Sequence, residues 1–183
     1  MALCSRTEVK EYLGMTGSTN DIDQLLKNLC DRISSVIETY CNRKFEQQTY
    51  IDFLDSYGTD VIYPAHRPIT SVSGIWESFH RSWDEDEIDP DNYYIVNESY
   101  IQRTDNIFIS KPKTIKIIYT AGYSSIPLDV KHCAITEVAR VYDRRKEVGV
   151  TNKTYADSST SYSIDDLLPT TKLVLDRYTM VNI

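Results

Sequence analysis

The strongest pattern along the chain is a series of apolar residues spaced three and four positions apart between residues 21 and 40. This spacing is typical of an α-helix that buries one face. The apolar positions are Ile22, Leu25, Leu26, Leu29, Ile33, Val36, Ile37 and Tyr40. Asp21 and Asp23 occupy the expected first turn, where negative charge suits the helix dipole. The pattern therefore predicts a long helix that packs through this face.

Shorter helices are predicted on both sides of this pattern. The spacing of Ser5 and Glu8 matches a capping box, which predicts a helix that ends near Leu13. A periodic apolar face between residues 128 and 146 predicts a third helix. Pro169 suits the first turn of a last short helix. Helical sequence is therefore expected at both ends of the chain.

Between residues 46 and 120 the apolar pattern changes to short β-branched or aromatic runs separated by turn residues. The runs cover residues 48–54, 61–63, 72–79, 93–96, 100–103, 107–109 and 115–119. They predict a small antiparallel β-sheet or partial barrel. The expected fold class is α+β, with a helical core built from residues 1–45 and 121–183. We expect one structural domain, of which the β insertion is either an integral part or a subdomain.

Residues 149–162 differ in composition from the segments around them. They are rich in Ser, Thr and Asn and contain few large aliphatic side chains. Because such a composition buries little apolar surface, we expect a mobile loop in the free subunit, between the third helix and the last.

The charge of the chain limits what it can bind. Its 183 residues include 27 acidic and 20 basic side chains, a net charge of −7. Binding along nucleic-acid phosphates requires a basic surface, so this balance argues against a protein that wraps DNA or RNA. The same negative charge is compatible with a protein that lets DNA slide past without binding it. The 14 tyrosines suit either half-buried sheet positions or protein interfaces.

Compartment signals are few. No run of 18 apolar residues is present, so no membrane-spanning segment is expected, and the first residues do not form a signal-peptide pattern. The four cysteines contain no C-x-x-C pair, which favours reduced thiols. Cys30, Cys41 and Cys133 lie beside apolar helical positions and are expected to pack as small hydrophobic residues.

The patterns that carry chemistry argue against an enzyme. The acidic run at residues 84–91 has no glycine for a calcium-loop turn and is interrupted by Pro90, which favours a solvated connection. The three histidines lack metal-ligand spacing. His132 and Cys133 are adjacent, but neighbours on a helix point roughly 100° apart. We therefore predict no catalytic residue, no metal and no cofactor.

One basic cluster, Arg140, Arg144 and Arg145, lies near the end of the predicted third helix. It has two interpretations. The cations complement the negative end of the helix dipole, or they contact a DNA backbone or an acidic partner. The position of the cluster in the expected last turn favours the first interpretation and leaves the second open.

Several segments taken together resemble a known family. They are E-V-K-E-Y-L-G at residues 8–14, I-E-T-Y-C-N-R-K-F at 37–45, R-P-I-T-S-V at 67–72, Y-T-A-G-Y at 119–123, and I-P-L-D-V-K-H-C-A-I-T-E-V-A-R at 126–140. In this order they resemble the head-tail connector, or head-completion adaptor, proteins of tailed phages. The resemblance covers nearly the whole chain. It does not include the acidic run at residues 83–92 or the segment after Gly149.

The resemblance implies a structural subunit of the virion neck, assembled in the host bacterial cytoplasm. It implies a ring of copies, expected to be twelve-fold to match the portal protein, with double-stranded DNA passing through the centre. The C-terminal region is then expected to contact the portal, through Leu173, Leu175, Tyr178 and Met180. Residues 149–162 are expected to reach the next neck component, a stopper or tail-completion protein. The candidate contacts there are Val150, Tyr155 and Tyr162.

Two alternatives remain open at this point. The chain could occupy another position in the neck, as the stopper or tail-completion protein itself, and its binding partner would show this. It could instead be a small enzyme or nucleic-acid-binding module, which would need a basic face or a convergent polar site. A DNA-binding assay with a steep salt dependence would favour the nucleic-acid-binding module.

Overall fold

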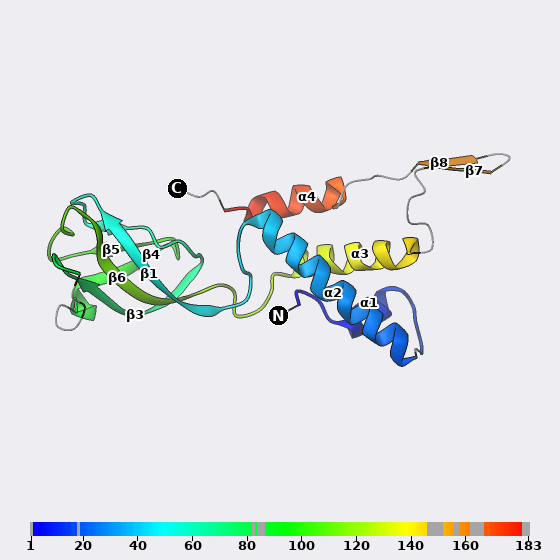
Figure 1. Cartoon of the computed structure of the whole chain (residues 1–183), viewed down its shortest axis with the longest axis horizontal. Coiled ribbons are helices and arrows are strands. Elements are labelled where there is room, and N and C mark those ends of the chain that lie inside the picture. The colour runs from blue at the N-terminus through cyan, green and yellow to red at the C-terminus, as the bar shows by residue number, and fades with distance from the viewer. Residues whose placement is uncertain are drawn as a thin grey trace. The chain divides into compact units, whose positions relative to one another are not determined.

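The computed structural model describes residues 2–17, 19–81, 83, 87–145, 152–155, 158–161 and 167–180. The chain divides into two compact units (Figure 1). A helical unit contains residues 1–43 and 126–181, and a β unit contains residues 44–125. The architecture is α+β, as the sequence predicts, with the β-rich segment inserted between helical segments.

The helical unit is built on two longer helices, α2 (Asn20–Cys41) and α3 (Leu128–Arg144), which pack against each other. The short helix α1 (Arg6–Tyr12) contacts both. The capping box predicted at its start is present: the Glu8 N–H donates to Ser5 Oγ at 3.3 Å, and the Ser5 N–H donates to Glu8 Oε2 at 2.8 Å. Glu8 Oε1 also lies 3.0 Å from Lys131 Nζ, which links α1 to α3.

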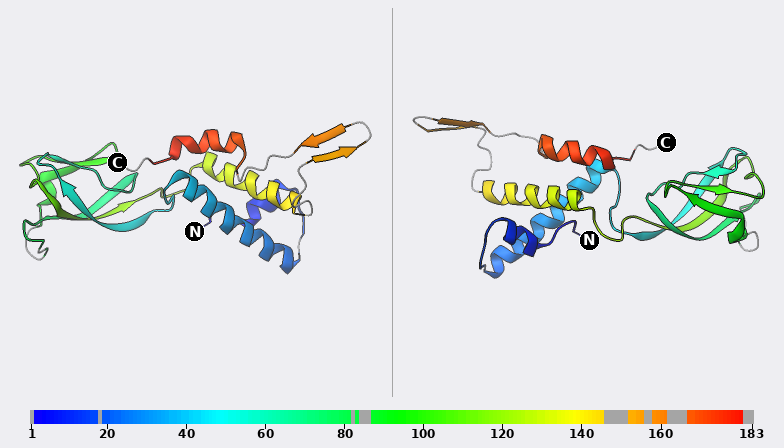
Figure 2. Two further views of the ribbon diagram at one scale, coloured as in Figure 1. Left: turned by 45° about the horizontal axis from the view of Figure 1, so that its top comes forward. Right: turned by 180° about the vertical axis from the view of Figure 1, so that it is seen from behind.

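The last helix, α4 (Pro169–Leu175), is followed by a 3₁₀ turn, η2 (Asp176–Tyr178). It runs antiparallel to α3, because Leu168 lies beside Glu137 and Tyr178 beside Asp129. Figure 2 shows the two helices side by side from two directions. The C-terminal segment therefore completes the helical core.

The buried face of α2 is shifted from the predicted one. Its buried residues are Leu26, Cys30, Ile33, Ser34, Ile37 and Cys41. Leu25 is exposed and Leu29 is half-buried. The apolar stripe predicted from the sequence is wider than the contact with α1, α3 and α4, so its flanking leucines lie outside the core. All four cysteines are buried, and the predicted packing of Cys30, Cys41 and Cys133 is confirmed.

The β unit contains two antiparallel three-stranded sheets that share one core. One sheet has the order β1-β6-β3 and the other β2-β5-β4. Their strands are β1 (Gln48–Ser56), β2 (Val61–Ile62), β3 (Ile69–Glu77), β4 (Tyr93–Val96), β5 (Tyr100–Arg103) and β6 (Lys111–Ala121), with a 3₁₀ turn η1 (Pro90–Asn92) before β4. The core is mostly isoleucine and includes Ile62 and Ile101 from one sheet and Ile75, Ile115 and Ile117 from the other.

The strand predicted at residues 107–109 is not a strand in the structure. The Phe108 side chain is buried in the shared core, and its N–H donates to the Thr59 carbonyl at 2.9 Å. The Ile109 N–H donates to the Glu77 carboxylate at 2.5 Å. The apolar run at 107–109 therefore reflects burial of a connecting segment, whose backbone groups are satisfied by a loop and a side chain rather than by a strand.

The segment predicted as a loop at residues 149–162 contains a hairpin. The strands β7 (Asn152–Tyr155) and β8 (Ser158–Ser161) pair antiparallel. Pairing satisfies backbone groups that a loop would leave to water, and hydroxyl and β-branched residues tolerate extended backbone. The expected contacts Val150 and Tyr162 lie outside the described residues, and Tyr155 is the last residue of β7.

Among the helices in the described part of the chain, none combines the length and the hydropathy needed to cross a membrane.

Candidate assembly surfaces

The C-terminal segment is attached to the helical unit by several polar contacts. The Tyr178 hydroxyl donates to the Asp129 carboxylate, with oxygen–oxygen distances of 2.9 and 2.8 Å. The Tyr40 hydroxyl donates to Asp176 at 2.6 Å, and this hydrogen bond raises the pKa of Tyr40. The Met180 N–H donates to the Cys41 carbonyl at 2.9 Å. These contacts give α4 and η2 a defined position on α2 and α3.

The four residues predicted as portal contacts are placed differently on this segment. Leu173 is 69% exposed on the outer side of α4. Leu175 is fully buried, and its carbonyl accepts hydrogen bonds from the Cys41 thiol and the Thr179 hydroxyl. Tyr178 and Met180 are half-buried. The prediction that Leu175 offers a surface contact is therefore corrected, because its side chain belongs to the core, and Leu173 remains as the exposed apolar candidate.

The basic cluster on α3 is largely engaged within the chain. Arg140 Nε and Nη2 both lie 2.8 Å from Glu137 Oε2. The Arg145 guanidinium lies 3.7 Å from the Tyr142 ring centroid and donates to the Tyr142 carbonyl at 2.5 Å. Arg144 occupies the last turn of α3, where a cation suits the helix dipole. These contacts favour the structural interpretation, and a contact with DNA or an acidic partner stays a prediction.

His132 and Cys133 do not form a reactive pair. The His132 ring packs edge-on against Tyr12, with ring centroids 6.0 Å apart. Cys133 is buried, and burial raises the pKa of its thiol, which disfavours the nucleophilic thiolate. Burial likewise raises the pKa of Cys41 to about 11. The packing of both cysteines suits a structural role.

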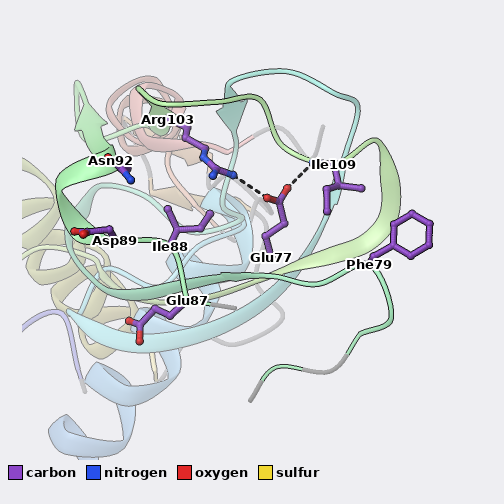
Figure 3. A pocket seen from close by; sticks show the side chains of 8 residues that line it. All are labelled: Glu77, Phe79, Glu87, Ile88, Asp89, Asn92, Arg103 and Ile109. Carbon is purple, nitrogen blue, oxygen red and sulfur yellow. Dashed lines mark hydrogen bonds and ion pairs between the residues drawn. The ribbon is translucent and has the colours of Figure 1, made fainter. Parts of the chain in front are cut away.

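A pocket of about 550 Å³ lies in the β unit beside the end of β3 (Figure 3). Its lining residues are Glu77, Phe79, Glu87, Ile88, Asp89, Asn92, Arg103 and Ile109. Glu77 Oε2 lies 2.7 Å from Arg103 Nη1, and its other oxygen accepts the Ile109 N–H. Figure 3 shows both contacts meeting at Glu77, while the carboxylates of Glu87 and Asp89 point away from it.

The ion pair in this pocket is already satisfied. Arg103 Nε lies 2.6 Å from Asp105 Oδ1, and the hydrogen bonds that Arg103 donates to Asp105 and then to Glu77 raise the pKa of Arg103. Arg103 in turn lowers the pKa of Asp105. The network ties β3, β5 and the 105–109 connection together, which is a bracing role. Within the described residues, no group of three or more His, Cys, Asp or Glu side chains could hold a metal ion.

A surface that the sequence analysis did not predict lies on the β1-β6-β3 sheet, opposite the shared core. We call it the outer sheet face and define it as three rows across the strands: Thr49, Thr120 and Ser71; Ile51, Ile118 and Gly74; Phe53, Lys116 and Trp76. The signal for it is in β1, where both alternating sets of residues contain apolar side chains. That pattern is typical of a strand covered on both faces.

Comparisons with known proteins found a family match and several solved structures with a similar fold. Residues 2–181 match the model of the head completion protein family. No curated protein matches the chain significantly. The structure is similar to a chain in the neck of an empty gene transfer agent (GTA) particle computed with C6 symmetry, with a TM-score of 0.63 and 14% identity. That match covers 97% of this chain and 90% of the other.

Two further solved structures share the fold. One is a chain in the virion of the native gene transfer agent particle, with a TM-score of 0.61 at 14% identity, covering 97% of this chain and 90% of that one. The other is a chain in the neck of the native GTA particle computed with C12 symmetry. It has a TM-score of 0.60 at 15% identity and covers 97% of this chain and 88% of that one.

The family match spans nearly all of the chain, and its range contains every motif quoted from the sequence. It confirms the predicted family. The chain belongs to the head completion protein family.

Proposed function

We propose that this chain is the neck subunit that joins the portal protein to the stopper or tail-completion protein, by forming a twelve-membered ring through which DNA passes. The observation that carries the proposal is the family match over residues 2–181. The fold shared with a GTA neck chain, from a particle neck computed with C12 symmetry, supports it. The expected site is the virion neck, after assembly in the bacterial cytoplasm.

The helical unit supports a portal contact through α4. A contact surface that keeps its shape before its partner arrives loses less entropy on binding, and the bonds from Tyr178 and Met180 to the rest of the unit hold this segment in place. Leu173 projects from it with most of its side chain exposed. An apolar side chain on a braced helix is suited to insertion into a pocket of a partner.

The charge distribution supports free passage of DNA. The β unit contains thirteen acidic and seven basic residues, so it carries −6 of the net charge of −7. A ring of acidic units repels phosphates wherever these residues face the channel. The basic residues of α3 that would bind phosphate are partly engaged by Glu137 and Tyr142.

The proposal is tested by mixing the purified chain with the purified portal protein of the same phage. We expect negative-stain images to show a ring of added density at one end of the portal. Leu173→Asp should weaken this binding at least about tenfold, because it places a charge in an apolar contact. Leu128→Asp is the matched control, since Leu128 is 80% exposed on the same unit.

Three outcomes would count against the proposal. Absence of added density on the portal would exclude the connector position. Capture by the stopper or tail protein, without any contact to the portal, would favour the alternative of a stopper or tail-completion protein. A low-salt DNA-binding assay with a steep salt slope would instead favour a nucleic-acid-binding module.

A further inference from the structure

Two of the four buried cysteines lie next to each other in the helical unit. Cys4 directly precedes Ser5, the N-cap residue of α1, and Cys30 lies in the middle of α2. The two residues are 4% and 2% exposed, and their thiols are hydrogen-bonded to each other. Two sulfur atoms in this arrangement need only a small movement to form a covalent bond.

Neighbouring contacts hold the segment before α1 in this position. The Leu3 N–H donates to Ser34 Oγ at 2.8 Å, and the Ser34 hydroxyl donates to the Cys30 carbonyl at 2.7 Å. Leu3 is itself buried. Ser34 lies one turn after Cys30 on α2, so these bonds fix Cys4 beside Cys30. Because Cys4 precedes α1, its backbone is free of helical geometry and can adjust to the requirements of a disulfide.

The other two cysteines provide a comparison within the same unit. Cys41 and Cys133 are also buried, at 0% and 7% exposure. The Cys41 thiol donates to the Leu175 carbonyl at 3.7 Å rather than to another sulfur. Burial is the first cause of the raised pKa of both thiols. Burial alone therefore does not distinguish Cys4 and Cys30, but the thiol–thiol contact does.

We infer that Cys4 and Cys30 form a reversible disulfide when the folded chain meets a small-molecule disulfide such as oxidised glutathione. The bond would tie the segment before α1 to the middle of α2. In a reducing cytoplasm the pair stays as two thiols, so the bond forms only in a more oxidising environment. The inference goes beyond the proposed function and does not depend on the contact with the portal.

The ionisation of the pair sets the order of the two steps. The hydrogen bond from Cys4 lowers the pKa of Cys30, while the same bond, and then burial, raise the pKa of Cys4. The thiolate is the nucleophile in thiol–disulfide exchange, so Cys30 reacts first. Local opening of the segment that contains Leu3 gives the reagent access to the Cys30 sulfur.

The exchange balances without any further reagent. The Cys30 thiolate attacks one sulfur of oxidised glutathione, which breaks the S–S bond of the reagent and releases one glutathione thiolate. Cys4 then loses its proton and attacks the Cys30 sulfur of the mixed disulfide, and the second glutathione thiolate leaves. The electron pair and the two protons that the cysteines lose end on the two glutathione thiols. An excess of reduced thiol reverses both steps.

The experiment uses the full-length chain, first reduced and then incubated with oxidised glutathione under native conditions. Remaining thiols are blocked with N-ethylmaleimide in denaturant before digestion with trypsin. Trypsin places the four cysteines in four separate peptides, of which residues 1–6 contain Cys4 and residues 28–32 contain Cys30. Mass spectrometry should find these two peptides linked, and dithiothreitol should separate them. The peptides of Cys41 and Cys133 should carry N-ethylmaleimide.

Thermal unfolding provides a second readout. The oxidised wild type should unfold at a midpoint at least about 5 °C above that of the reduced wild type, because a bond between residues 4 and 30 restricts the unfolded chain. Cys4→Ser should abolish this difference, and Cys133→Ser, the matched control, should keep it. Each protein is compared with itself in the two redox states, so a loss of stability caused by the substitution itself cancels.

Four outcomes would overturn the inference. The linked peptides could be absent after native incubation, or Cys41 and Cys133 could lose their thiols as fast as the pair. Cys30 could stop at the mixed disulfide with glutathione, which would show that Cys4 does not reach it. A linked chain whose unfolding midpoint equals that of the reduced chain would show that the bond does not tie the segment before α1 to the folded unit.

Discussion

The Glu137 carboxylate, which is fully buried on α3, accepts the Leu168 N–H at 2.7 Å, and Leu168 is the N-cap residue of α4. The cap residue has no side chain that could accept a hydrogen bond from the first turn. Glu137 therefore supplies from another helix both the acceptor and the negative charge that a helix N-terminus favours. Its second oxygen binds Arg140. One buried carboxylate thus positions the helix that carries Leu173.

We predict that Glu137→Ala lowers the free energy of unfolding by about 3 kcal/mol, because Arg140 and the Leu168 N–H both lose a buried partner. Glu137→Gln should cost about half as much, since its amide oxygen still accepts the Leu168 N–H. Urea unfolding followed by circular dichroism measures both. Equal losses for the two variants would show that the charge, rather than the hydrogen bond to α4, accounts for the effect.

A second prediction compares adjacent leucines of α2. Leu26 is fully buried and Leu25 is exposed. Leu26→Asp should lower the free energy of unfolding by about 4 kcal/mol or more, because it buries an unpaired charge in the helical core. A loss of this size is a large part of the total stability of many small domains. Leu25→Asp should change stability by less than about 1 kcal/mol. Thermal unfolding measures both, and similar midpoints for the two variants would contradict the assigned buried face.

This pair also shows how far the sequence alone leads. The period of α2 and the capping box of Ser5 and Glu8 are local features, and both were predicted from residue spacing. Whether Leu25 or Leu26 is buried depends on where α1, α3 and α4 lie, and the spacing of residues within α2 carries no information about that. Phe108 was assigned to a strand for the same reason: burial was evident, but the partners of its backbone, Thr59 and Glu77, are distant in sequence.

For the candidate surfaces too, the sequence predicted some features, and the packing of the folded chain was needed for the others. The importance of the C-terminal segment came from the family resemblance, whereas the burial of Leu175 and the exposure of Leu173 follow from helix packing. The outer sheet face was not predicted, because an apolar residue such as Ile51 looks the same in sequence whether the core or another chain covers it. Only the register of β1, β6 and β3 separates its two faces.

A third prediction concerns acid stability. The pKa of Glu8 is lowered, first by the hydrogen bond from the Ser5 backbone and also by Lys131. A carboxyl with a depressed folded-state pKa contributes stability above its unfolded value, near 4.5, and loses it as the pH falls through the folded value. Glu8→Gln should therefore be less stable than the wild type at pH 7, by about 0.5–1 kcal/mol. This difference should shrink below pH 4.5.

The control for this prediction is Glu11→Gln, which removes an exposed carboxylate from the same helix. Urea unfolding between pH 3 and pH 7 gives the pH dependence of each protein. A difference between the wild type and Glu8→Gln that stays constant over this range would contradict the linkage to Glu8 ionisation.

The last prediction concerns residues 149–162. Deleting them should leave the thermal midpoint of the helical unit nearly unchanged, because the contacts that position α4 come from Glu137, Asp129 and Cys41. Neck assembly should nevertheless be impaired, since β7 and β8 form a two-stranded hairpin, and such a hairpin is marginal in water without a further partner. Replacing the segment by Gly and Ser residues of equal number controls for the shortened connection. If both variants aggregate, the segment belongs to the fold. If the next neck component attaches normally to either variant, the hairpin makes no assembly contact.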